Sequence, residues 1–222
     1  MHDPKSAEAE ADARQLHRLL FFSDAVFAIV LTLLVLELRP PHGETDAELQ
    51  QGLAAMSLHF LAFAISFALG SAFWLAHMRT MRGMQKFDWP TTAANLLHLS
   101  AVALTPFASA FLGEHVASIV AFEVYAGLVV FVSFTSCLLW LVASREGGRL
   151  MGGLTIRNRI AVAIRTSGIG WCFLIGIGLI QMGEVGIARF CWILMAPLMA
   201  IAAIVAGRPK KRVKKTAPAA AA

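Results

Sequence analysis

Three polar side chains stand near one end of the first long apolar segment of the chain. Ser23 and Asp24 interrupt the otherwise apolar run LLFFSDAVFAIVLTLLVL, and Arg18 directly precedes it. An ionised carboxylate is costly in hydrocarbon, so an acid at this depth faces the interior of a helix bundle or water and has a partner. We expect Asp24 to find a hydrogen-bond partner within its own chain and thereby to fix the orientation of the first helix.

The polar residues that can meet Asp24 lie at a matching depth on neighbouring segments. Arg18 precedes the first apolar run, Trp74 and His77 lie at the end of the second, and Asn95 lies early in the third. A buried polar network is stable only if every member finds a partner. The pattern therefore predicts a structural network around Asp24.

A stripe of aliphatic side chains follows a different face of the same segment. Val26, Ile29, Leu33 and Leu36 have the 3-4-3 spacing of one helix face. At ~100° per residue, Asp24 lies about 140° around the helix from Ile29. Periodicity alone favours a lipid-facing or core surface for this stripe.

The composition limits the class of protein that can hold these residues. Of the 222 residues 58% are hydrophobic and 15% are charged, and the mean hydropathy is +0.67. Soluble domains are roughly 45–50% apolar and about 25% charged, and disordered chains are still more polar. The strands of membrane β-barrels alternate apolar with polar residues, whereas this chain has long apolar runs. We therefore expect an all-α membrane protein.

Six apolar runs are long enough to cross a bilayer, which takes ~20 residues. They lie at residues 17–38, 52–77, 91–112, 116–143, 160–181 and 185–207. This predicts a transmembrane domain of six helices over residues 17–207, an N-terminal segment over 1–16, and a basic, Ala/Pro-rich tail over 208–222. The N-terminal segment has no apolar core, so we expect no cleavable signal peptide.

The basic residues are distributed unevenly between the two sides of the membrane. Sixteen of the 19 Lys and Arg residues flank the runs on one side, whereas the opposite loops hold only Arg39. The positive-inside rule then places both termini in the cytoplasm. We expect the basic tail to contact anionic lipid headgroups, and we expect no nucleic-acid partner, because the charge is spread over four separate segments.

Two other functions use residues elsewhere in the runs. His59 and His98 suggest paired haem ligands in a membrane redox protein, and Glu123 and Arg165 suggest an ion or proton relay in a secondary transporter. Haem ligation of this type needs histidines that face each other at a suitable depth, and nothing in the sequence shows that these two do. The chain also lacks the Gly/Pro-broken helix pairs found in transporters.

The remaining chemistry-bearing residues indicate no enzyme and no metal site. Cys137, Cys172 and Cys191 lie far apart within apolar runs, which is typical of small packing residues. The chain also has no phosphate-binding loop and no nucleophile-and-base motif.

The first helix resembles a known family signature. Arg-x-x-x-Phe-Ser-Asp-Ala-Val-Phe-Ala-Ile, which contains Phe22, Ser23 and Asp24, is followed by Thr-Leu-Leu-Val-Leu-Glu-Leu. This is similar to the first transmembrane helix of the endolysosomal and prokaryotic potassium channels with a Phe-Ser-Asp motif. The segments 73–77 (FWLAH) and 95–107 resemble that family's second and third helices.

The resemblance implies a potassium-permeable cation channel in the plasma membrane that needs no cofactor. It implies a pore surrounded by the first helices of several subunits, with Ile29 at the narrowest point and Leu33 and Leu36 further along. Thr32, beside this stripe, would offer a hydroxyl to the ions. The chain has one copy of the motif and no Thr-Val-Gly-Tyr-Gly filter, so the resemblance implies a homotetramer with a hydrophobic constriction.

Overall fold

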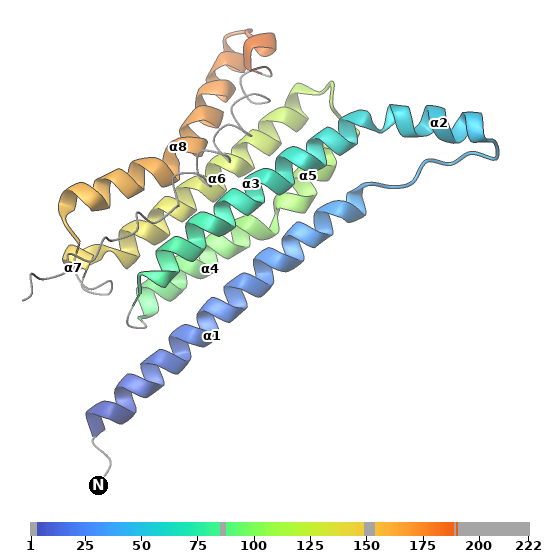
Figure 1. The fold of residues 1–222 in the computed structure, drawn as a ribbon. Helices are drawn as coiled ribbons and strands as arrows, with labels where there is room; N and C mark the ends of the chain where they lie inside the picture. The colour runs from blue at the N-terminus through green and yellow to red at the C-terminus, as the bar shows by residue number, and fades with distance from the viewer. Residues whose placement is uncertain (1–3, 85–87, 149–153, 189, 191–222) are drawn as a thin grey trace, which may run out of the picture.

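The computed structural model describes residues 4–84, 88–148, 154–188 and 190. Every regular element in these ranges is helical (Figure 1). The elements in chain order are α1 (Pro4–Leu33), the 3-10 helix η1 (Leu34–Glu37), α2 (Asp46–Ala55), α3 (Ser57–Arg82), α4 (Trp89–Ala103), α5 (Thr105–Glu114), α6 (Ile119–Ala143), α7 (Arg145–Gly148) and α8 (Ile156–Gln181).

Five segments of the described residues are long and apolar enough to cross a membrane. They are Glu10–Glu37, Ser57–Arg82, Trp89–Glu114, Ile119–Ala143 and Ile156–Gln181. These correspond to the first five predicted runs, so the expectation of an all-α membrane protein is met at that level. Most of the sixth predicted run and the whole basic tail lie outside the described residues.

Three helix boundaries differ from the predicted ones. The first helix begins at Pro4 instead of residue 17, so the polar N-terminal residues continue the helix. The second run is divided at Met56 into α2 and α3, and the third is divided at Leu104 into α4 and α5. The second of these breaks has a clear cause: Pro106 has no N–H to donate, and its ring clashes with the carbonyl four residues earlier.

Side-chain caps fix where several helices begin. Thr45 and Glu48 form a capping box at α2, and Asp88 accepts from the backbone N–H of Thr91 at the start of α4. Ser118 caps α6 in the same way. The N–H groups of Glu44 and Thr45 donate to the carboxylate of Glu48, and these hydrogen bonds lower its pKa.

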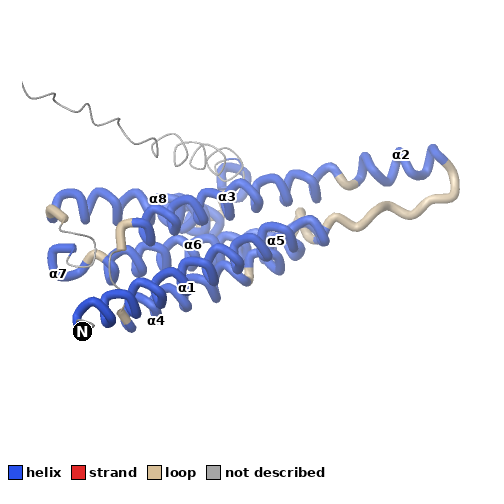
Figure 2. Tube along the Cα trace, turned by 60° about the horizontal axis from the view of Figure 1, so that its bottom comes forward, coloured by secondary structure: helices blue, strands red, loops and turns tan. Residues whose placement is uncertain are grey.

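The bundle is built around α6, and α1 lies at its edge. Half of the apolar window of α6 is buried, compared with 22% of the window in the first span. Figures 1 and 2 show α1 running along one side of the bundle and α8 on the side away from it. Most of the surface of α1 is therefore exposed in a single chain.

A side chain of α6 joins the backbone of α8. The hydroxyl of Ser133 accepts from the N–H of Gly170 at 2.9 Å and donates to the carbonyl of Thr166 at 3.0 Å. The Ser133 hydroxyl thus bridges a carbonyl and an N–H from residues four apart. In a regular α-helix these two groups hydrogen-bond to each other directly. A side chain inserted in this way bends a helix, and Figure 1 shows α8 bent along its length.

Close packing at Gly170 gives a testable consequence. A Cβ at this position would lie 2.8 Å from Cβ of Ser133, whereas a Cβ at Gly178 of the same helix would meet nothing within 4 Å. We expect Gly170→Ala to destabilise the protein by about 1–3 kcal/mol through overpacking. Gly178→Ala is the matched control, and its greater helix propensity should leave stability equal or up to about 1 kcal/mol higher. Thermal unfolding in detergent measures both, and equal melting curves for the two variants would contradict the packing argument.

Candidate functional site

One face of α1 packs against the bundle. Its buried side chains recur at helical spacing and include Phe27, Val30 and Leu34, which are 1%, 5% and 1% exposed. Ser23, on the same face, is fully buried. The sequence analysis did not single out Phe27 or Leu34, although their 4-3-4 spacing from Ser23 is a signal of a core face.

A second face of the first helix, which continues from α1 into η1, carries the predicted stripe. Ile29, Leu33 and Leu36 are 56%, 40% and 67% exposed in the single chain, and Thr32 beside them is also exposed. Val26 differs from the other members of the stripe, because it is partly buried and packs on the main core. The exposed stripe therefore runs from Ile29 to Leu36.

The hydroxyl of Thr32 is oriented by its own helix. It lies 3.0 Å from the carbonyl of Ala28 and 2.8 Å from that of Ile29, so its hydrogen is donated to the backbone. Its oxygen lone pairs stay free to accept a hydrogen bond or to contact a cation.

A chain of hydrogen bonds joins α1 to α3 and α4. Nε2 of His77 lies 2.7 Å from Oδ1 of Asn95, and Nδ2 of Asn95 donates to Oγ of Ser23 at 3.0 Å. The Ser23 hydroxyl then donates to the carbonyl of Leu19 at 2.8 Å. Since an amide oxygen only accepts, His77 carries its proton on Nε2. Ser23, His77 and Asn95 are all buried, so this chain is the buried polar contact between α1 and the bundle.

A second histidine, which the network prediction did not include, adjoins this chain. The ring of His98 stacks on that of His77 with centroids 5.8 Å apart, and Phe27 of α1 contacts both rings. Nδ1 of His98 lies 3.1 Å from the hydroxyl of Thr135, whose hydrogen is donated to the α6 backbone. His98 therefore donates from Nδ1. The other ring nitrogens, Nδ1 of His77 and Nε2 of His98, are buried without a hydrogen-bond partner among the described residues.

Asp24 lies outside the buried chain. Nε1–H of Trp74 donates to its Oδ1 at 2.9 Å, so its partner is one of the four candidates and lies in the same chain. The Asp24 side chain is exposed, in contrast to the buried network that the sequence suggested. Arg18 is exposed too and has no hydrogen bond or ion pair with the part of the chain that the structure describes, and Phe22 is 50% exposed.

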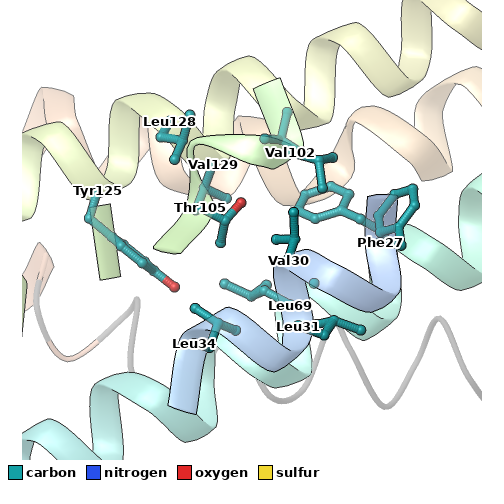
Figure 3. Close-up of a pocket in the computed structure, with 13 residues that line it drawn as sticks. Phe27, Val30, Leu31, Leu34, Leu69, Val102, Thr105, Tyr125, Leu128 and Val129 are labelled. Carbon is teal, nitrogen blue, oxygen red and sulfur yellow. The ribbon is translucent and has the colours of Figure 1, made fainter. Parts of the chain in front are cut away.

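A small apolar cavity of about 20 Å³ lies behind α1. Figure 3 shows Phe27 and Val30 of α1 and Leu34 of η1 lining it, with Tyr125 reaching in from α6. The Tyr125 hydroxyl is 3.0 Å from that of Ser66 and is thereby satisfied at this depth. A cavity of this size holds about one water or a methyl group, so it is a packing defect and not a ligand site.

The residues of the two alternative functions do not form the sites expected of them. His59 and His77 are 18 residues apart on α3, about 27 Å along its axis, and His98 stacks on His77, so His59 and His98 cannot be paired ligands. Glu123 accepts from Nε2 of Gln181 at 2.6 Å. In the residues that the structure describes, no group of three or more His, Cys, Asp or Glu side chains is placed to hold a metal ion.

The cysteines within the described residues pack in the bundle. Cys137 and Cys172 are half-buried free thiols, and the sulfur of Cys137 lies 3.6 Å from the carbonyl of Ala163. Cys191 lies outside the described residues.

The fold and the apolar spans define an integral membrane protein with an all-helical bundle. Residues 18–106 match the family model described as endosomal/lysosomal potassium channel TMEM175. The chain belongs to the TMEM175 family, because it is 35% identical over 148 residues to a potassium channel of Chamaesiphon minutus, in an alignment that covers 64% of this chain and 72% of that protein.

Two further comparisons agree with this assignment. A potassium channel of Streptomyces collinus is 32% identical over 130 residues, which cover 57% of this chain and 63% of that protein. The chain thus spans slightly less than two thirds of that relative. The crystal structure of a lysosomal potassium-selective channel TMEM175 homologue from Chamaesiphon minutus superposes with a TM-score of 0.73 at 26% identity, covering 86% of this chain and 98% of that one.

The hydrogen-bond chain predicts the effect of removing its central member. Asn95→Ala leaves Ser23 and His77 without their shared partner, and each buried unsatisfied group costs about 1–3 kcal/mol. We expect a loss of at least about 2 kcal/mol in the free energy of unfolding. Asn158→Ala is the matched control, since the Asn158 side chain is exposed on α8. Denaturant or thermal unfolding in detergent compares them, and an equal, small effect of both variants would remove Asn95 from any anchoring role.

Proposed function

We propose that the chain forms a potassium-permeable channel in which α1 of several subunits lines a central pore. Family membership and the related bacterial potassium channels support the conduction of potassium. The observation that carries the proposal is the exposure of Ile29 and Leu33 of α1 and Leu36 of η1, on a face of the first helix away from its buried side. A channel conducts passively, so the chain is not an enzyme and uses no cofactor beyond the permeating ion.

The proposed filter is a hydrophobic constriction. A ring of Ile29 side chains narrows the pore, so a cation sheds part of its hydration shell to pass, and potassium sheds water at a lower cost than sodium. The same ring can close the pore by dewetting. Thr32 turns its oxygen lone pairs away from its own backbone and can contact the ion after the ring.

The proposed assembly is a homotetramer in the plasma membrane. Each chain supplies one α1, so several chains are needed to close a ring, and the exposed stripe then faces the pore. Both termini lie in the cytoplasm in this arrangement, as the distribution of Lys and Arg indicates. The basic tail over 208–222 contacts anionic headgroups, and residues 17–207 form the channel domain.

The constriction is tested by changing its first residue. Ile29→Asn introduces a polar side chain into the ring, so we expect larger flux and a lower preference for potassium over sodium. Potassium and sodium fluxes from proteoliposomes measure both quantities. Ile175→Asn makes the same change on α8, where Ile175 is 63% exposed, and should leave the preference unchanged. An Ile29→Asn protein with wild-type preference and flux would exclude Ile29 from the pore.

The Asp24–Trp74 hydrogen bond is tested through assembly. This bond ties α1 to α3 of the same chain, so Asp24→Ala and Trp74→Phe should both release α1 and lower the fraction of intact tetramers. A hydrogen bond to a charged group is worth about 1.5–3 kcal/mol, less at an exposed site. The double variant should therefore lose little more than either single variant. Native mass spectrometry gives the oligomer fraction, and intact tetramers with altered ion preference would contradict the anchoring role.

A further inference from the structure

A second cavity, of about 180 Å³, lies between α3, α6 and α8. It is several times larger than the ~30 Å³ that one water occupies in the liquid. Two arginines line it, Arg79 from α3 and Arg165 from α8. The other lining residues are Ala72, Phe73, Ala76, Thr80, Trp140, Val162, Thr166 and Ile169.

Among the described residues, the two guanidinium groups at this cavity have no acidic partner. In the described part of the chain neither makes an ion pair or hydrogen bond, and they lie close enough to repel each other. Asp88, an acid at this end of the bundle, is already paired with Arg145. Beyond α8 the sequence has one acidic residue, Glu184, and Arg165 lies about 24 Å along the helix axis from that end of α8.

The other polar side chains that line the cavity already donate hydrogen bonds to backbone carbonyls. The hydroxyls of Thr80 and Thr166 donate to carbonyls of their own helices. Nε1–H of Trp140 donates to the carbonyl of Arg159 at 2.9 Å. The free donors at the cavity are therefore the two guanidinium forks, which suit the oxygens of a phosphate group.

The position of the cavity favours a lipid as the source of that phosphate. Arg79 lies about 5 Å along the axis from the end of α3, and Arg165 about 13 Å from the start of α8. These ends adjoin the loops rich in Lys and Arg, which the positive-inside rule places on the cytoplasmic side. Arg165 is exposed, and Figures 1 and 2 place α8 on the side of the bundle away from α1.

We propose that Arg79 and Arg165 together bind the phosphate group of an anionic phospholipid in this cavity. Basic pockets between transmembrane helices on the cytoplasmic side bind such headgroups. The apolar wall formed by Phe73 and Ile169 would contact the part of the lipid next to the phosphate. The lining residues of this site are distinct from the exposed stripe of α1.

The wild-type protein tests the ligand class. The purified protein in detergent is titrated with phosphatidylglycerol and with phosphatidylcholine, and retained lipid is counted by native mass spectrometry. Both lipids carry a phosphodiester, but the quaternary ammonium of phosphatidylcholine would be repelled by the two guanidinium groups, so we expect phosphatidylglycerol to bind at least about tenfold more tightly. Equal retention of the two lipids would overturn the proposal. Inorganic phosphate that binds as tightly as phosphatidylglycerol would overturn the assignment to a lipid.

Matched double variants test the residues. Arg79→Gln with Arg165→Gln should reduce phosphatidylglycerol retention toward that of phosphatidylcholine. Arg82→Gln with Arg157→Gln removes two charges from the same helices at exposed positions outside the cavity, and should retain wild-type binding. The basic tail is present in every variant, so a difference in lipid retention between the two double variants measures binding at the cavity. An equal loss of phosphatidylglycerol retention in both double variants would show that surface charge alone causes the effect, and would contradict the proposed site.

A conservative pair covers the case in which the first variant fails to fold. Arg79→Lys with Arg165→Lys keeps both charges and removes the forked donors. We expect it to elute as the wild type does in size-exclusion chromatography and to bind phosphatidylglycerol more weakly. Unchanged binding by a folded lysine pair would show that fork geometry plays no part and would contradict the proposed recognition.

Discussion

The rotation of α1 about its own axis depends on one buried chain of hydrogen bonds. In a membrane, apolar side chains gain little by leaving lipid for protein, so helix contacts are fixed by close packing and by polar pairs. Turning α1 by one residue, about 100°, would remove Ser23 from Asn95 and leave buried polar groups unpaired. The energetic cost of that state selects a single rotation. Because Ile29 lies on another face of the same rigid helix, the chain that fixes Ser23 also fixes where Ile29 points.

The directions of the protons in this chain follow from the chemistry of its members. Ser23 donates to the carbonyl of Leu19, so it can only accept from Asn95. The amide oxygen of Asn95 then accepts a hydrogen bond from Nε2–H of His77, whereas Nδ1 of His77 has no partner among the described residues. The aromatic contacts of Phe27 with both imidazole rings surround the polar chain with apolar surface. A change at one member therefore affects all the others, as expected of a buried network in a low-dielectric interior.

The amino-acid sequence predicts the spans well and the contacts less well. Apolar runs report the bilayer, so the five spans of the described residues lie where hydropathy placed them. The breaks at Met56 and Leu104 were missed, because a short interruption hardly changes the average hydropathy of a run. A common depth grouped Asp24 with Trp74, and the two side chains are hydrogen-bonded in the structure. The depth of a residue in the membrane does not give the rotation of its helix. The sequence therefore could not predict that the exposed Asp24–Trp74 hydrogen bond is separate from the buried hydrogen-bond chain of Ser23.

The arginines at one end of the bundle all count toward the positive-inside rule, but they play different structural roles. The positive-inside rule counts charges and does not distinguish between them. Arg145 pairs with Asp88 and thereby ties the end of α6 to the start of α4. Arg159 donates to Ser144 and to the carbonyl of Leu141, which satisfies backbone at the end of α6. Arg79 and Arg165 have no such partners among the described residues, and the proposed anionic lipid would reduce the repulsion between these two like charges at one cavity.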